Sequence, residues 1–300
     1  MNKTFLPTFL LTAFFLPAAV QAAGSLSDLS STSRSGSLPK TGDMVFSFLP
    51  KSFQRNPTLE MTVNTEVTQY GRLFRSVSPS APAYYVAGAA GFKSLGDPVG
   101  GEKSPPAADL ERAMKKSLAN NGFLPADQPG QQPSLVLIYY WGSHYKLDPD
   151  TAKLFPERAA QYQLERASLV GGKKYVAELA NRMEFGPAPG DNTELKEFLR
   201  YQAADDLYFV VASAYDYASM ARGQKRLLWR TTMTVNAAGV NMRETLSPLI
   251  ATAAPFFGHE TVDPEISARR VSRSGNVEIG EARVIEDSVP LKPAPADPKK

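Results

Sequence analysis

The chain contains 300 residues, of which 43% are hydrophobic, so it is long enough to bury one large core or two smaller ones. Its 33 basic and 30 acidic residues leave a formal net charge of +3, and this near balance does not favour nucleic acid as a partner. The absence of cysteine excludes disulfides, thiolate metal sites, cysteine nucleophiles and the lipid-modified cysteine of a bacterial lipoprotein.

The beginning of the chain has the pattern of a secretory signal. Lys3 precedes an apolar stretch at residues 5–20, and the small residues Ala22 and Ala23 follow at the spacing that a signal peptidase recognises. The stretch is shorter than the ~20 residues that span a bilayer and is interrupted by proline, so a retained anchor is the weaker alternative. We therefore predict a cleaved signal peptide at residues 1–22 and a periplasmic or secreted protein with no membrane span after signal removal.

The remainder of the chain divides by composition into three parts. Residues 23–43 are rich in serine, glycine and threonine, and they contain too little apolar surface to offset their ordering entropy, which predicts a flexible leader. Residues 44–287 hold the strongly periodic segments and are predicted to form the folded domain. Residues 288–300 are rich in proline and predict an extended, disordered tail.

The first half of the domain contains patterns of two strands and a helix. Residues 59–67 alternate between apolar and polar positions, with Asn64 and Glu66 on the polar side, which predicts a half-exposed strand. A short strand is predicted at residues 84–87, and the following GAAGFKSLG is interpreted as a flexible loop because it lacks the spacing of a phosphate-binding loop. An apolar stripe at helical spacing predicts a helix over residues 107–121.

The longest unbroken apolar run is SLVLIYYWGSHY, at residues 134–145. Its aromatic and β-branched content, with Pro133 before it and Gly142 near its end, favours a strand over a buried helix. Both sides of this strand are apolar, so we predict the central strand of a sheet that is covered on both faces. Together with the strand and helix before it, this run has the order of a strand–helix–strand unit.

Helices and strands also alternate in the second half. Helices are predicted at residues 156–169 and 173–183, separated by Gly171 and Gly172, and a third at residues 193–204.

Residues 207–217 and 227–235 then predict an antiparallel hairpin, and apolar spacing predicts a helix over residues 246–257. A short terminal strand or hairpin is expected at residues 276–285. Three arginines lie between the last helix and this strand, and we interpret them as a solvated loop. They are Arg269, Arg270 and Arg273.

These elements predict an α/β or α+β fold. We expect a single domain over residues 44–287, with a mixed β-sheet of about five to six strands packed against several helices. The alternative is two smaller domains divided near residues 186–190, where glycine and proline break the chain.

Chemistry is constrained by the presence of only two histidines, His144 and His259. Any Ser-His-acid triad must use one of them, and the GxSxG and HExxH motifs are both absent. His144 follows the proposed central strand, where ligands gather in parallel sheets. The candidate ligand-binding residues are Trp141, Ser143, His144, Tyr145, Asp216 and Tyr217, the last two only if their strand runs parallel to the central one. The simpler interpretation is that His144 is an ordinary residue at the rim of the sheet.

A metal site lacks support in the spacing of the sequence. Without cysteine, zinc would need ligands drawn from the two histidines and nearby carboxylates, and the two histidines lie far apart in the chain. The residues in question are His144, Asp148, Asp150, His259, Glu260 and Asp263. We therefore expect no metal and no cofactor.

Two runs resemble those of uncharacterised secreted bacterial proteins with an α/β core. ERAMKKSLANNG leads into SLVLIYYWGSHY, and later KRLLWRTTMTVN leads into a helix that ends in APFFG. The resemblance implies the fold class but no established activity. We therefore expect a non-enzymatic cell-envelope interaction or small-ligand binding module. The alternative is an exported hydrolase or metal-dependent enzyme that uses His144, as its catalytic residue, with nearby carboxylates.

Overall fold

A computed structural model of the chain describes residues 49–96, 104–185 and 193–273. The predicted signal peptide, the leader, the terminal strand at residues 276–285 and the Pro-rich tail lie outside the described residues, as does the segment 186–190. The described residues belong to one compact unit, so the single mixed α/β domain is confirmed. None of the helices within these ranges has the length and apolar character needed to cross a bilayer.

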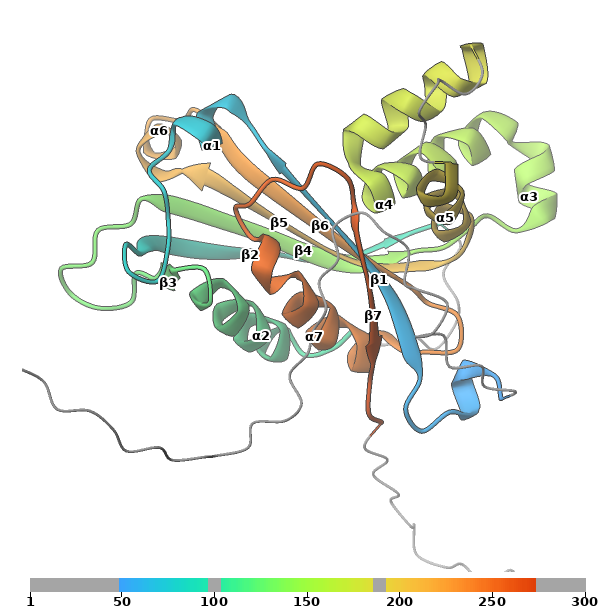
Figure 1. Ribbon diagram of the computed structural model, residues 1–300, viewed down its shortest axis with the longest axis horizontal. Helices are drawn as coiled ribbons and strands as arrows, with labels where there is room; N and C mark the ends of the chain where they lie inside the picture. The colour runs from blue at the N-terminus through green and yellow to red at the C-terminus, as the bar shows by residue number, and fades with distance from the viewer. Residues whose placement is uncertain (1–48, 97–103, 186–192, 274–300) are drawn as a thin grey trace, which may run out of the picture. The chain divides into compact units, whose positions relative to one another are not determined.

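A mixed sheet forms the centre of this unit (Figure 1). In chain order its strands are β1 (Thr58–Val67), β2 (Ala83–Leu95), β3 (Phe123–Pro125), β4 (Leu135–His144), β5 (Leu207–Asp216), β6 (Leu227–Asn236) and β7 (Glu265–Arg270). Their order across the sheet is β3-β2-β4-β5-β6-β1-β7. β2 runs parallel to β3 and β4, and the other neighbouring pairs are antiparallel. The sheet thus has 7 strands rather than the five to six predicted, because the short β3 and the arginine-rich β7 lack a strong strand pattern.

Helices cover both faces of the sheet (Figure 1). α2 (Ala107–Ala119) and α7 (Met242–Ala253) pack on one face, while α4 (Pro156–Phe185) and α5 (Thr193–Ala204) pack on the other. The short elements are η2 (Lys51–Phe53), α1 (Gln69–Leu73), α3 (Pro149–Leu154), α6 (Tyr217–Ala221) and η3 (Ala254–Phe256). Gly172 has a φ of 72° and divides α4 into two helical parts. This confirms the prediction of two helices separated by glycine.

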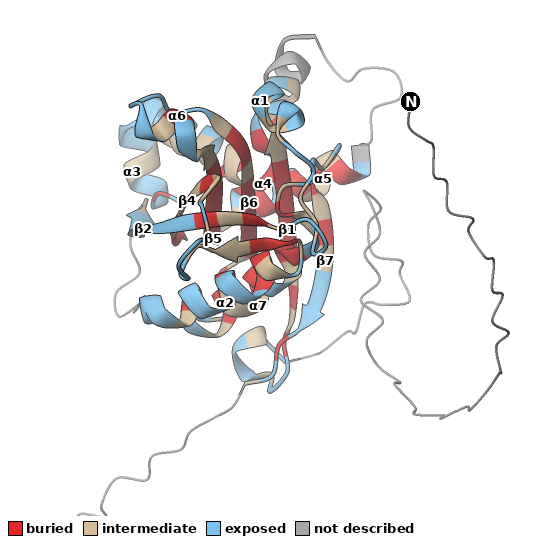
Figure 2. Cartoon of the chain, turned by 90° about the vertical axis from the view of Figure 1, so that its left-hand side faces the viewer, coloured by how far each residue is buried: buried red, intermediate tan, exposed pale blue. Residues whose placement is uncertain are grey.

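The larger core lies between the sheet and the pair α2 and α7. β4 contributes alternate side chains to it, as its period-two pattern predicts. These side chains are Leu135, Leu137, Tyr139 and Trp141. The opposite side of β4 is half-buried, at Val136, Ile138 and Tyr140, so this strand is covered less completely on its second face than we predicted. Figure 2 shows the buried residues concentrated on the inner strands, whereas β2 is mostly exposed.

Two expectations for the early strands were wrong. GAAGFKSLG is not a loop, because β2 continues through it to Leu95 and pairs with β4, with a bulge between Ala89 and Phe92. The strand at residues 59–67 is not half-exposed, since helix α4 packs against its polar side. As a result, Thr62 and Asn64 are only 1% and 7% exposed. The strand–helix–strand order and the β5–β6 hairpin are confirmed.

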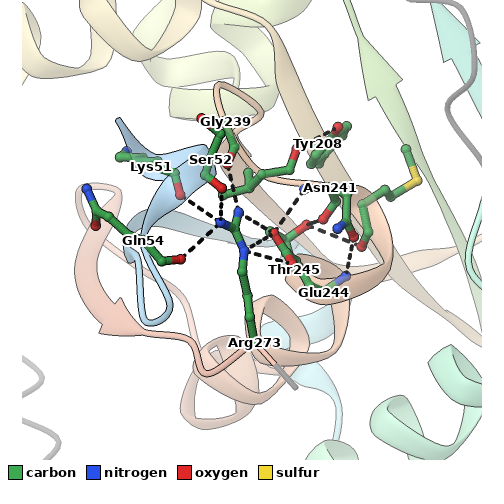
Figure 3. Close-up of polar contacts among 11 residues, drawn as sticks. Lys51, Ser52, Gln54, Tyr208, Gly239, Asn241, Glu244, Thr245 and Arg273 are labelled. Atoms are coloured by element: carbon green, nitrogen blue, oxygen red, sulfur yellow. Dashed lines mark hydrogen bonds and ion pairs between the residues drawn. The ribbon is translucent and has the colours of Figure 1, made fainter. Parts of the chain in front are cut away.

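Arg273 ties the two ends of the described unit together (Figure 3). Its guanidinium pairs with the Glu244 carboxylate in the first turn of α7, at 2.7 Å for the closest nitrogen–oxygen pair. It also donates to the carbonyl oxygens of Lys51, Ser52, Gln54 and Gly239, at 2.7–3.1 Å. Only 20% of its side chain is exposed.

The interpretation of the arginine cluster as a solvated loop is therefore wrong for Arg273, whereas Arg269 and Arg270 are exposed at the end of β7.

Candidate functional site

His144 is the last residue of β4, so it lies at the rim of the sheet, and it is fully buried there. Its Nδ1 lies 3.3 Å from the carbonyl oxygen of Tyr145, and its Nε2 lies 3.4 Å from a carboxylate oxygen of Glu165 on α4. The ring of Tyr162 packs edge-on against the imidazole, with the centroids 5.4 Å apart. The imidazole therefore lies between the sheet and α4, where its packing is structural.

The other candidates from the same run are also packed into the fold. Trp141 and Tyr145 are each 4% exposed, and Ser143 is fully buried. The indole Nε1 of Trp141 donates to the hydroxyl of Ser104 at 3.0 Å. The run is therefore part of the core rather than an open binding surface.

Asp216 and Tyr217 lie at the opposite end of the strand pair from His144. β4 and β5 are antiparallel, so Leu135 faces Asp216 in register while His144 faces Leu207. Asp216 and Tyr217 could lie near His144 only if β5 ran parallel to β4, and it does not. Asp216 instead caps α6, and its carboxylate accepts from the Ser219 backbone N–H at 2.7 Å.

The residues considered for zinc have other partners. Asp148 caps α3 by accepting from the backbone N–H groups of Asp150 and Thr151, and Asp150 pairs with Lys153 at 3.1 Å. Within the described ranges, no three or more histidine and acidic side chains are grouped so that they could hold a metal ion.

Burial lowers the pKa of His144 below its usual range, although the nearby Glu165 carboxylate acts in the opposite direction. The unfolded chain takes up a proton on this histidine near the ordinary pKa of about 6.5. Because the folded state binds that proton less readily, stability is lost as the pH falls below about 6.5, and the loss ends once the pH is below the folded-state pKa. We therefore expect the free energy of unfolding of the wild type to fall more steeply from pH 7 to pH 5 than that of His144→Gln, as measured by urea denaturation. Parallel curves for the two proteins would contradict this prediction.

A polar cavity of about 510 Å³ lies elsewhere in the structure, where the end of β1 meets α4, α5 and the loop before β7. We call it the polar cavity. β1 contributes Asn64, Thr65 and Glu66, and the loop contributes residues 260–264. The loop is held beside β1 because the backbone N–H of Thr65 donates to the Thr261 hydroxyl at 2.9 Å, and the N–H of Thr261 donates to the carbonyl of Thr65 at 3.1 Å.

The helical wall of the polar cavity carries charged and apolar side chains. α4 provides Lys174, Tyr175 and Glu178, and α5 provides Lys196 together with two leucines. The leucines, Leu195 and Leu199, also belong to the smaller core between the sheet and these helices. A buried apolar cluster therefore lies directly beneath the charged groups.

Most of the charges around the polar cavity are paired. Within the described ranges, each acidic side chain in its lining except Glu66 forms an ion pair. The pairs are Lys174–Asp263 at 3.3 Å, Lys196–Glu178 at 3.0 Å and Arg72–Glu260 at 2.6 Å. These pairs are partly exposed, so they contribute little to stability. They do neutralise most of the charge around the opening.

The sequence did not lead us to the polar cavity, although two signals belong to it. Gly171 and Gly172 mark the break in α4 that brings its second half to β1. Glu260 and Asp263 were considered only as metal ligands. Because Asn64 and Glu66 were assigned to a solvent-facing side of their strand, nothing in the sequence connected them to these other residues.

No protein-family model matches the chain, and no curated protein matches it. Among solved structures, it is similar to the PelC dodecamer from Paraburkholderia phytofirmans, with 12% identity and a TM-score of 0.32 over 65% of this chain and 96% of that chain. A leucine-to-methionine variant of that PelC gives 11% identity and a TM-score of 0.29, over 65% of this chain and 95% of the other. At this level of similarity nothing of PelC transfers to this chain.

Proposed function

We propose that this protein is an exported, non-enzymatic binding module that holds a small polar ligand in the polar cavity. The observation that carries the proposal is a cavity of about 510 Å³ lined by Asn64, which is 7% exposed and whose amino group donates to no residue in the described ranges. Pockets of about 300–1,000 Å³ with a few placed polar groups are typical of small-molecule sites. The signal-like start of the sequence supports export to the periplasm or beyond.

The alternative, a hydrolase or metal-dependent enzyme that uses His144, has weaker support. His144 is enclosed by Tyr162 and α4, and it does not line the polar cavity. A general base must come within hydrogen-bond reach of its substrate, and a fully buried imidazole outside the cavity does not offer this. Binding without chemistry is therefore the better-supported function.

The test is ligand-observed NMR with a defined panel of amines, amino acids, organic acids and sugars. We expect some panel members to bind the wild type and to bind Val262→Trp at least about tenfold more weakly, because an enlarged side chain narrows the cavity. Val262 lines the cavity and is 79% exposed, so the replacement should not disturb folding. Leu73→Trp is the matched control, since Leu73 is 85% exposed and lies outside the lining.

Two outcomes would contradict the proposal. One is a panel in which no binding depends on Val262. The other is chemical conversion of a bound compound during incubation with the wild-type protein but not with His144→Gln, which would favour the enzymatic alternative.

A further inference from the structure

Glu66 is the acidic residue of the polar cavity that lacks an ion pair among the described residues. Its Oε1 accepts from the backbone N–H of Lys173 at 2.8 Å, and its second carboxylate oxygen has no hydrogen-bond partner in the described ranges. Arg230 is opposite Glu66 in the β1–β6 register, but its guanidinium Nε donates to Ser213 at 3.2 Å. A partly buried carboxylate is most stable with a positive partner, and here that partner is missing.

Asn64 places a hydrogen-bond donor next to this carboxylate. It is two residues before Glu66 on β1, so both side chains lie on the same face of the strand. Its Oδ1 accepts from the Thr261 hydroxyl at 3.3 Å, whereas its Nδ2 amino group has no partner in the part of the chain that the structure describes. Asn64 is 7% exposed and lines the polar cavity, and its amino group is not enclosed by the protein, so a ligand in the cavity can reach it.

Gly172 shows that the two groups converge. A Cβ added to this glycine would lie 2.3 Å from Asn64 Nδ2 and 2.9 Å from Glu66 Oε1, so the two side chains are neighbours beside Gly172. Both residues also line the cavity, so the Asn64 amino group and the second carboxylate oxygen of Glu66 are presented to it by neighbouring side chains.

We infer that the ligand of the polar cavity carries a protonated primary amine with an oxygen acceptor beside it, an inference that rests on the proposed function. Glu66 receives the ammonium group, and the Asn64 amino group donates to the neighbouring oxygen. The lysines of the lining do not favour an anionic ligand, because each already pairs with an acidic side chain. A hydrogen bond to a charged group is about twice as strong as a neutral one, so the ammonium–Glu66 contact should dominate the affinity.

Glu66 also has a structural role, which the experiment must separate from ligand recognition. Its Oε1 satisfies the N–H of Lys173, the first residue after the break in α4. Glu66→Gln retains a carbonyl oxygen that can accept this bond but removes the charge. Its thermal stability should therefore remain close to that of the wild type. Glu60→Gln, on the same strand but outside the lining, is the matched control.

The probes are alaninamide, which combines an ammonium with a carbonyl oxygen, and N-acetylalaninamide, which lacks the charge. In NMR titrations we expect alaninamide to bind the wild type and Glu60→Gln equally, and Glu66→Gln at least about tenfold more weakly. N-acetylalaninamide should bind none of the three. Equal affinity of both probes, unchanged alaninamide affinity in Glu66→Gln, or no binding of alaninamide to the wild type would each overturn the inference. If other panel members still bind in a Val262-dependent manner, the proposed function stands while the amine assignment fails.

Discussion

Replacing Trp141 with alanine is expected to lower the free energy of unfolding by about 3–5 kcal/mol. The indole is 4% exposed within the larger core, and it stacks on Tyr139 with a centroid distance of 6.2 Å. Truncation would leave a large cavity and would also remove the 3.0 Å hydrogen bond to the Ser104 hydroxyl. Urea denaturation followed by far-UV circular dichroism measures the change without depending on tryptophan fluorescence.

Tyr217→Ala is the comparison for this experiment. Tyr217 is 38% exposed, so truncating it removes less packing, and we expect a loss of about 1 kcal/mol or less. A loss of about 1 kcal/mol or less for Trp141→Ala, as expected for Tyr217→Ala, would mean that the Trp141 side chain does not contribute to a packed core.

Arg273→Met is expected to lower the free energy of unfolding by about 2–3 kcal/mol, because it leaves the Glu244 carboxylate and several carbonyl groups without their donor. The 17% exposure of the Glu244 side chain limits the loss by allowing some hydration. Arg273→Lys should recover only part of the stability, since a lysine cannot reproduce the planar fork that reaches Glu244 and the carbonyl oxygens together. The measurement is again urea denaturation.

Arg269→Met provides the control for the loss of a positive charge. Arg269 is exposed and donates to the Thr252 hydroxyl at 3.3 Å, so its replacement should change the free energy of unfolding by about 0.5 kcal/mol or less. If Arg273→Met were as stable as this control, the contacts in Figure 3 would be irrelevant to holding the two ends of the unit together.

Pattern and propensity predicted the type of most elements correctly where the local signal was strong. α2 and α5 follow an apolar stripe at helical spacing, and β4 follows from an apolar run too rich in β-branched and aromatic residues for a helix. The break in α4 at Gly172 was predictable because glycine readily adopts a positive φ. The predicted strand at residues 84–87 was too short, because GAAGFKSL has low strand propensity. In the structure this segment is nevertheless a strand, because it pairs with β4.

The sequence by itself determined the absence of cysteine chemistry, the period of each strong strand and helix, and hence the α/β class. Only the tertiary structure decided which polar residues are enclosed and which ends of the strands meet. Antiparallel pairing separates Asp216 from His144, and the packing of α4 on β1, with α5 beside α4, encloses Asn64 and places Glu66 in a cavity. The physical reason is that local periodicity records which side of a strand is polar, whereas burial of that side depends on a helix more than a hundred residues away.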